Sequence, residues 1–281
     1  MSYDLSRLGW DEIFASKCPS DAAPARVLRA DRGVCTVLDD TGVTRASLGG
    51  GLLLAAARDP AGLPGAGDWV VLRRWPDRRV TIECVLPRRT VLIRRTSDKD
   101  STGQVLAANM DTVAVLEPIR PAPDDARIER LLALARESGA KPVLVLTKSD
   151  TLAKSDDPAA VARHLARLAP GVPVIAVSVS RGTGVEALRA YASDGRTLAL
   201  LGRPGAGKST LVTALSGTPV MPVQQISGPG RHRTPDHHLV LLPSGGAVID
   251  TPGIGGVDQL DTAEGLAARL TGTVGHRRRR P

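Results

Sequence analysis

Residues 202–209 read Gly-Arg-Pro-Gly-Ala-Gly-Lys-Ser, and the rest of the chain is interpreted around this stretch. An apolar run at 198–201 precedes it, and a segment with helical character, 210–215, follows it. A strand, a glycine-rich turn and a helix in this order form a phosphate-binding loop. Glycines let backbone N–H groups approach a phosphate, and the helix N-terminus adds partial positive charge. The alternative is an ordinary glycine-rich turn, which would not require the lysine and the serine.

The side chains of this loop have separate expected roles. Lys208 can reach the β and γ phosphates of a nucleotide and is a catalytic candidate, and the Ser209 hydroxyl can hold Mg²⁺. The backbone around them is expected to bind the phosphates. The other residues of the predicted nucleotide site in this loop are Gly202, Arg203, Pro204, Gly205, Ala206, Gly207 and Thr210.

A second acidic strand end follows the loop. Asp250 closes the apolar run 247–249 and precedes Thr-Pro-Gly. Asp250 is expected to hold Mg²⁺ through water, and the Gly253 N–H to touch the γ-phosphate. Between the two motifs, Thr234 is a candidate second hydroxyl ligand of Mg²⁺ on a switch loop. The residue after Gly253 is Ile254, whose aliphatic side chain cannot orient water.

Two other strand ends carry residues suited to guanine. In the segment Thr147-Lys148-Ser149-Asp150, the Asp150 carboxylate can accept both edge N–H groups of guanine, a pair that adenine does not offer. The Lys148 stem can cover the base, while Thr147 stands where Asn is usual and leaves one supporting bond open. Ser178 and Val179 fit the partner loop, whose backbone N–H contacts the guanine carbonyl oxygen.

Alternating strand and helix patterns over 109–270 predict a mainly parallel sheet with helices on both faces. In such sheets ligands bind at the carboxyl ends of the strands, where all of these motifs lie. The predicted strands are 112–116, 142–146, 172–177, 198–201 and 247–249. The predicted helices are 124–138, 158–168, 184–191, the one that begins at 210, and 262–270.

The first part of the chain has a different pattern. Short β-type runs predict a small barrel of the oligonucleotide-binding (OB) type within residues 23–95, and a generic small β domain is the alternative. Residues 1–22 form an amphipathic lead-in, 96–108 are polar and expected to be a linker, and 271–281 form a basic tail. The five runs are 25–28, 34–38, 43–46, 68–72 and 79–86.

Composition limits the class of protein. The 281 residues suffice for about two domains, and no apolar run approaches a membrane span or a signal peptide. Three separated cysteines suit a reducing cytoplasm, where we expect a monomer that does not bind membranes. The net charge of +8 is carried mostly by arginine, which favours a polyanionic partner, although a GC-rich genome produces the same bias.

The order of the motifs identifies a family. The guanine motifs precede the phosphate motifs, whereas ordinary GTPases have the reverse order, so the sheet is circularly permuted. With the β domain in front, the chain resembles the circularly permuted, ribosome small-subunit-dependent GTPase family (RsgA, also called YjeQ). The matching segments are 8–10, 67–70, 86–89, 107–111, 147–150, 202–210, 230–232 and 250–253.

The resemblance implies an OB barrel, a permuted GTPase core and a C-terminal zinc domain. It also implies GTP hydrolysis stimulated by the small (30S) ribosomal subunit late in its maturation, with 16S rRNA as partner and GTP, GDP and Mg²⁺ as ligands. The family's switch histidine is thought to position the attacking water, a role that falls on His232, with Thr234 at the metal. A solvated loop histidine is the alternative for His232.

Departures from the family leave three functions open. Arg233 and Pro235 replace switch threonines, and no cysteine follows Cys84, so we expect no zinc. The leading interpretation is a GTP-hydrolysing assembly factor for the small subunit. The second is a non-hydrolysing, GTP-dependent RNA-binding paralogue, and the third is a P-loop ATPase or kinase, against which Asp150 argues. The arginines of the tail are a phosphate-binding segment or a solvated charge run.

Overall fold

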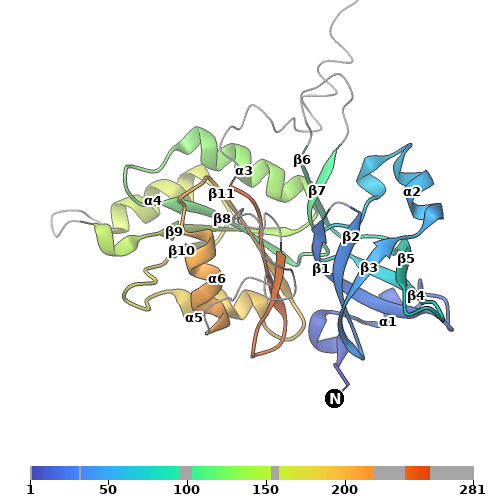
Figure 1. The fold of residues 1–281 in the computed structure, drawn as a ribbon. Coiled ribbons are helices and arrows are strands. Elements are labelled where there is room, and N and C mark those ends of the chain that lie inside the picture. The colour runs from blue at the N-terminus through green and yellow to red at the C-terminus, as the bar shows by residue number, and fades with distance from the viewer. Residues whose placement is uncertain (1, 32, 95–102, 153–157, 218–237, 254–281) are drawn as a thin grey trace, which may run out of the picture.

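A closed barrel and a parallel sheet lie side by side, joined where strand β1 pairs with strand β12 through Arg29 and His238 (Figure 1). The computed structural model of the chain describes residues 2–31, 33–94, 103–152, 158–217 and 238–253. Across this described part, no helix has the length and apolar character needed to cross a membrane.

The barrel confirms the OB-like prediction. Its strands follow one another in the order β1-β2-β3-β5-β4, and pairing of β4 with β1 closes the ring, which a generic open β domain lacks. Apolar side chains that alternate along the strands fill the interior, and Leu52 of helix α2 packs into it. The elements are β1 (Ala23–Asp31), β2 (Val34–Asp39), β3 (Gly42–Leu48), α2 (Gly50–Ala56), η2 (Pro60–Gly62), β4 (Trp69–Arg74) and β5 (Val80–Val85).

The lead-in covers the outer face of the barrel. It forms two short helices, η1 (Leu5–Leu8) and α1 (Glu12–Ala15), and the Asp11 carboxylate caps α1 by accepting two backbone N–H bonds. Trp10 and Phe14 surround Trp69 of β4, with ring centroids 4.8 and 5.9 Å from that of Trp69. This aromatic cluster fixes the lead-in to the barrel.

The predicted linker, 96–108, is wrong at its C-terminal end. Residues 104–108 form strand β7 (Gln104–Ala108), which pairs antiparallel with β6 (Val91–Arg94). Leu106, Ala107 and Ala108 are fully buried. The polar residues before them in the sequence obscured this short apolar run, because only its last three residues enter the core.

The second sheet confirms the alternating prediction. Its strand order is β10-β9-β8-β11-β13-β12, and the first five strands are parallel. The strand leading into the glycine-rich loop, β11, is therefore central. The strands are β8 (Thr112–Pro118), β9 (Lys141–Thr147), β10 (Val174–Ala176), β11 (Thr197–Gly202), β12 (His238–Leu241) and β13 (Ala247–Asp250).

Helices cover both faces of this sheet, as predicted (Figure 1). Residues that alternate along β8, β9 and β11 point to opposite sides and form two separate apolar clusters. One cluster contains residues of α3 and α4, and the other contains residues of α5 and α6. The helices are α3 (Asp125–Glu137), α4 (Pro158–Leu168), α5 (Val185–Arg189) and α6 (Lys208–Ser216), with short turns η3 (Ser149–Thr151) and η4 (Ala190–Ala192).

Candidate functional site

The glycine-rich loop connects β11 to α6 at the carboxyl edge of the sheet. Gly205 and Gly207 have φ of +77° and +93°, a region that other residues avoid. A Cβ atom on Gly202 would lie 2.6 Å from the Leu116 carbonyl oxygen. The turn therefore requires glycine for two reasons, its backbone conformation and its close approach to β8.

Lys208 lies inside this loop. Its ammonium group donates to the carbonyl oxygens of Gly202, at 2.9 Å, and Arg203, at 3.1 Å. Burial lowers the pKa of Lys208, and the nearby Asp250 carboxylate opposes that shift. Phosphate oxygens would offer this ammonium charge-assisted bonds in place of bonds to neutral carbonyls, so the group is placed to bind a nucleotide.

The two predicted metal ligands in the described residues lie together. The Ser209 hydroxyl donates to Oδ2 of Asp250 at 2.9 Å, although the two residues belong to different elements. A hydroxyl and a carboxylate are hard oxygen ligands that suit Mg²⁺. The donor set at this point therefore fits the predicted ion.

Gly253 packs directly on the phosphate loop. A Cβ atom at this position would lie 2.8 Å from the backbone nitrogen of Pro204 and 2.9 Å from its Cα. Only glycine fits there, so the Asp-Thr-Pro-Gly segment and the phosphate loop are held in contact. The hydroxyl of Thr251, within this segment, donates to the Leu200 carbonyl oxygen at 2.6 Å.

The two predicted guanine loops also meet. The Ser178 hydroxyl donates to Oδ1 of Asp150 at 2.7 Å, and the backbone N–H of Ser149 donates to the Val177 carbonyl oxygen at 3.1 Å. The bond from Ser178 is the main cause of a lowered pKa of Asp150. The carboxylate is therefore ionised at neutral pH, the state that accepts the guanine N–H groups.

Lys148 takes an uncommon backbone conformation. Its φ of 57° and ψ of 38° lie in the left-handed region, which costs energy for a residue with a side chain. Such residues cluster at binding sites. Here the conformation turns the chain sharply between β9 and η3, so that Asp150 follows the strand end at once.

A hydrogen bond joins the guanine loop to the phosphate loop. The buried Thr147 hydroxyl donates to the Ala206 carbonyl oxygen at 2.8 Å. Threonine at this position therefore makes a supporting bond of its own to the phosphate loop. The predicted base-binding and phosphate-binding loops are consequently in direct contact.

Two further residues of the predicted partner loop, Ser180 and Arg181, lie beside Asp150. The Arg181 guanidinium approaches the Asp150 carbonyl oxygen at 3.5 Å, and the hydroxyl groups of Ser178 and Ser180 are 3.0 Å apart. The sequence places both residues in the partner loop, directly after Val179, but gives no sign of these contacts with the Asp150 segment. The predicted switch residues, His232 to Pro235, lie outside the described residues, as do Ile254, the predicted helix 262–270 and the basic tail 271–281. His238, three residues after Pro235 in the sequence, begins β12.

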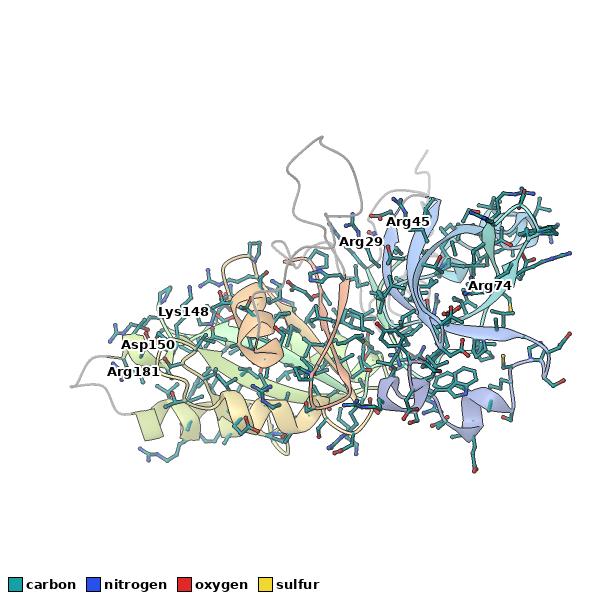
Figure 2. All side chains as sticks on the ribbon, turned by 60° about the horizontal axis from the view of Figure 1, so that its bottom comes forward. Arg29, Arg45, Arg74, Lys148, Asp150 and Arg181 are labelled. Atoms are coloured by element: carbon teal, nitrogen blue, oxygen red, sulfur yellow. The ribbon has the colours of Figure 1, made fainter. Side chains whose placement is uncertain are left out.

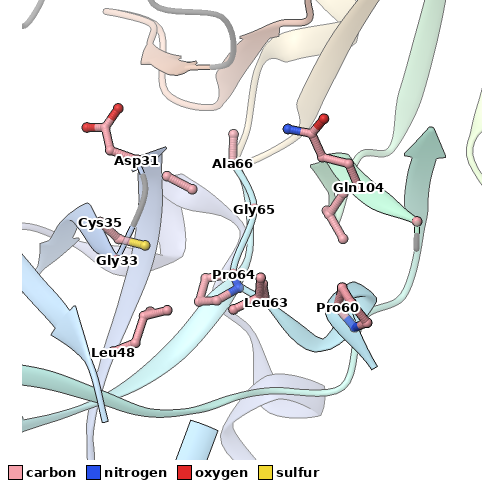
Figure 3. Close-up of a pocket in the computed structure, with 13 residues that line it drawn as sticks. Asp31, Gly33, Cys35, Leu48, Pro60, Leu63, Pro64, Gly65, Ala66 and Gln104 are labelled. Atoms are coloured by element: carbon pink, nitrogen blue, oxygen red, sulfur yellow. The ribbon is translucent and has the colours of Figure 1, made fainter. Parts of the chain in front are cut away.

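Two groups of charged residues lie at opposite ends of the molecule (Figure 2). Lys148, Asp150 and Arg181 lie at the predicted guanine loops, and Arg29, Arg45 and Arg74 lie on the barrel. A separate hollow of about 310 Å³, lined mainly by apolar and small residues such as Leu48, lies between the barrel and β7 (Figure 3). It contains none of the predicted nucleotide-site residues.

Comparisons with known proteins agree with this arrangement. The family model described as RsgA GTPase matches residues 85–260. The Small ribosomal subunit biogenesis GTPase RsgA of Streptomyces coelicolor is 44% identical over 269 residues, covering 93% of this chain and 72% of the relative. The protein of the same name from Opitutus terrae is 40% identical over 281 residues, covering 92% and 76%.

Solved structures show the same fold. The crystal structure of YjeQ from Thermotoga maritima superposes with a TM-score of 0.61 and 25% identity, covering 84% of this chain and 76% of that one. The crystal structure of YloQ, a circularly permuted GTPase, has a TM-score of 0.54 and 18% identity, covering 85% and 74%. At that identity, YloQ supports the fold alone.

Proposed function

Because the chain belongs to the RsgA GTPase family, we propose that it hydrolyses GTP during late maturation of the small ribosomal subunit, and that the subunit stimulates hydrolysis. The observation that carries this proposal is the Thr147–Ala206 hydrogen bond, which joins the Asp150 loop to the phosphate loop. A site with both parts suits a guanine nucleotide. We further propose that the protein acts in the cytoplasm as a monomer and without zinc.

Each residue of the site has a separate proposed role in the reaction. Asp150 selects guanine, the loop N–H groups and Lys208 bind the phosphates, and Ser209 and Asp250 would hold Mg²⁺. The metal supplies positive charge beside the β and γ phosphates. On the basis of the family resemblance, we propose that His232 positions the attacking water and that Thr234 supplies the second hydroxyl ligand of the metal.

The direct experiment is GTP hydrolysis by the purified chain, titrated with purified small ribosomal subunits. The rate should rise with subunit concentration and saturate, and ATP should not substitute for GTP. A protein that binds GTP but whose rate stays flat would be the non-hydrolysing paralogue. A protein that prefers ATP would contradict the role of Asp150.

The barrel offers a basic surface for 16S rRNA. Exposed Arg73 and Arg79 lie over Trp75, with guanidinium carbons 3.9 and 5.4 Å from the ring centroid. Arg74 differs, because its guanidinium binds the buried Asp39 carboxylate at 2.5 Å. Arg74 therefore supports the barrel itself. Arg79 pairs with Asp77 at 2.5 Å, but both side chains are exposed, so a phosphate can replace that carboxylate.

We expect an Arg73→Ala, Arg78→Ala, Arg79→Ala triple variant to bind small subunits on the order of tenfold or more weakly, because each phosphate contact adds salt-dependent affinity. The slope of affinity against salt should also decrease, while GTP affinity stays unchanged. The matched control replaces Arg130, Arg136 and Arg167, three exposed arginines of α3 and α4, with alanine. Equal weakening in both variants, or salt-insensitive binding of the native protein, would contradict the proposed surface.

A further inference from the structure

Arg26 is a fully buried arginine of β1 that joins three segments of the chain. Its side chain is 2% exposed. One terminal nitrogen donates to the Leu8 carbonyl oxygen in the lead-in. The other donates to the Asn109 carbonyl oxygen and to the Thr197 hydroxyl, both at 3.1 Å. Arg26 therefore links the barrel and the lead-in to the first residue of β11.

Burying the charged Arg26 side chain costs free energy of folding. Burial lowers the pKa of Arg26 to about 10, so the group is still charged at neutral pH. Its hydrogen bonds go to carbonyl and hydroxyl oxygens, and its Nε has no hydrogen-bond partner among the described residues. Buried charges of this kind often stabilise a fold less than apolar side chains of similar volume would. Packing alone is therefore a weak explanation for an arginine at this position.

The lead-in makes a second connection to the sheet. The Arg7 carbonyl oxygen accepts the Gly246 N–H at 2.7 Å, and the Arg7 guanidinium donates to the Pro243 carbonyl oxygen at 3.2 Å. These contacts hold the turn that precedes β13. Gly9 also packs so closely that a Cβ there would lie 2.8 Å from the Gly195 carbonyl oxygen, just before β11.

We call Arg26 and Arg7, with their partners Thr197, Pro243 and Gly246, the clamp. The clamp holds the amino ends of β11 and β13, which pair in parallel from Thr197 and Ala247 onward. The carboxyl ends of these same two strands lead to Ser209 and carry Asp250. Five residue steps along β11, about 17 Å, separate the clamp from the phosphate loop.

We propose that Arg26 is a positioning residue that couples the barrel to the phosphate site through Thr197 and β11. The proposal rests on the proposed function, in which the barrel contacts the small subunit. A paired strand inside a packed sheet moves as a rigid unit. A small shift of the barrel would therefore be carried along β11 to the phosphate loop, and hydrolysis depends steeply on where that loop holds the nucleotide.

The test uses Thr197→Val, which removes one hydroxyl and keeps the shape of a β-branched side chain. Its matched control is Thr112→Val, the same change at the buried amino end of the neighbouring strand β8, where the residue does not bond to Arg26. For each protein, the measurements are basal hydrolysis, subunit-stimulated hydrolysis, GTP affinity, subunit affinity and melting temperature.

We expect Thr197→Val to lower the ratio of stimulated to basal rate by about tenfold, within the range of typical coupling free energies. Basal rate and both affinities should stay near those of the native protein, and Thr112→Val should keep the full ratio. Arg26→Met should also lower the ratio of stimulated to basal rate. If that variant does not fold, the comparison of Thr197→Val with Thr112→Val is the test.

Two results would overturn the proposal while leaving the proposed function intact. In the first, the native protein is stimulated and Thr197→Val is stimulated equally. In the second, Thr197→Val loses basal and stimulated rates in the same proportion, as a purely structural role would cause. If small subunits do not stimulate hydrolysis by the native protein, both the proposed function and the coupling are contradicted. That result is obtained before any variant is measured.

Discussion

Replacing Asp150 with Asn is expected to weaken GTP binding on the order of a hundredfold or more, because two hydrogen bonds to a charged acceptor are disrupted. The same variant should bind xanthosine triphosphate better than the native protein does. An amide accepts from the N1–H of xanthine and donates to its 2-oxo group. The Ser178 hydroxyl, which now donates to Oδ1 of Asp150, still finds an acceptor oxygen in Asn.

The measurement is the affinity of both nucleotides for both proteins. The matched control is Asp125→Asn on α3, where the carboxylate bonds to His164 of α4. This control should leave both affinities unchanged. Equal losses for GTP and xanthosine triphosphate in Asp150→Asn would show that the residue supports the loop without reading the base.

The sequence was sufficient for features that depend on local pattern. The runs of Val, Leu and Ala in β8, β9 and β11 are buried on both faces and read as strands without any alternation. The glycine-rich loop was predictable because its glycines and lysine lie close together in the chain. That the predicted guanine and phosphate loops lie together follows from the rule that parallel strands place their carboxyl ends at one edge.

Elements that depend on distant contacts were missed. Helix α2 begins with two glycines, poor helix formers, and only Leu52 and Ala56 of it are buried, so its helical pattern is short. Strand β12 has four residues and was hidden beside the predicted switch. The Arg26–Thr197 bond joins residues 171 positions apart, and one arginine within a strand pattern gives no sign of such a partner.

The second large effect concerns the attacking water. In the described part of the site, Lys208 is positioned to bind the phosphates, and Ser209 and Asp250 are positioned to hold the metal. The Thr251 hydroxyl is already bonded to the Leu200 carbonyl oxygen. Ile254 is aliphatic, and His232 is two residues before Thr234, the expected metal hydroxyl. A neutral imidazole so close to a metal-bound threonine in the chain can accept a hydrogen bond from the attacking water.

We therefore expect His232→Ala to bind GTP with unchanged affinity and to lose ten- to a thousandfold in subunit-stimulated rate, roughly the contribution of such a positioning group. His164→Ala, a surface histidine of α4, is the control. Arg233→Ala is measured beside it, because a guanidinium adjacent to His232 can instead stabilise the developing phosphate charge as an arginine finger in cis. A loss confined to Arg233→Ala assigns catalysis to the arginine, since the histidine is then dispensable. If both variants keep the full stimulated rate, the water is positioned by a group outside this switch, and the family's histidine role does not apply to this chain.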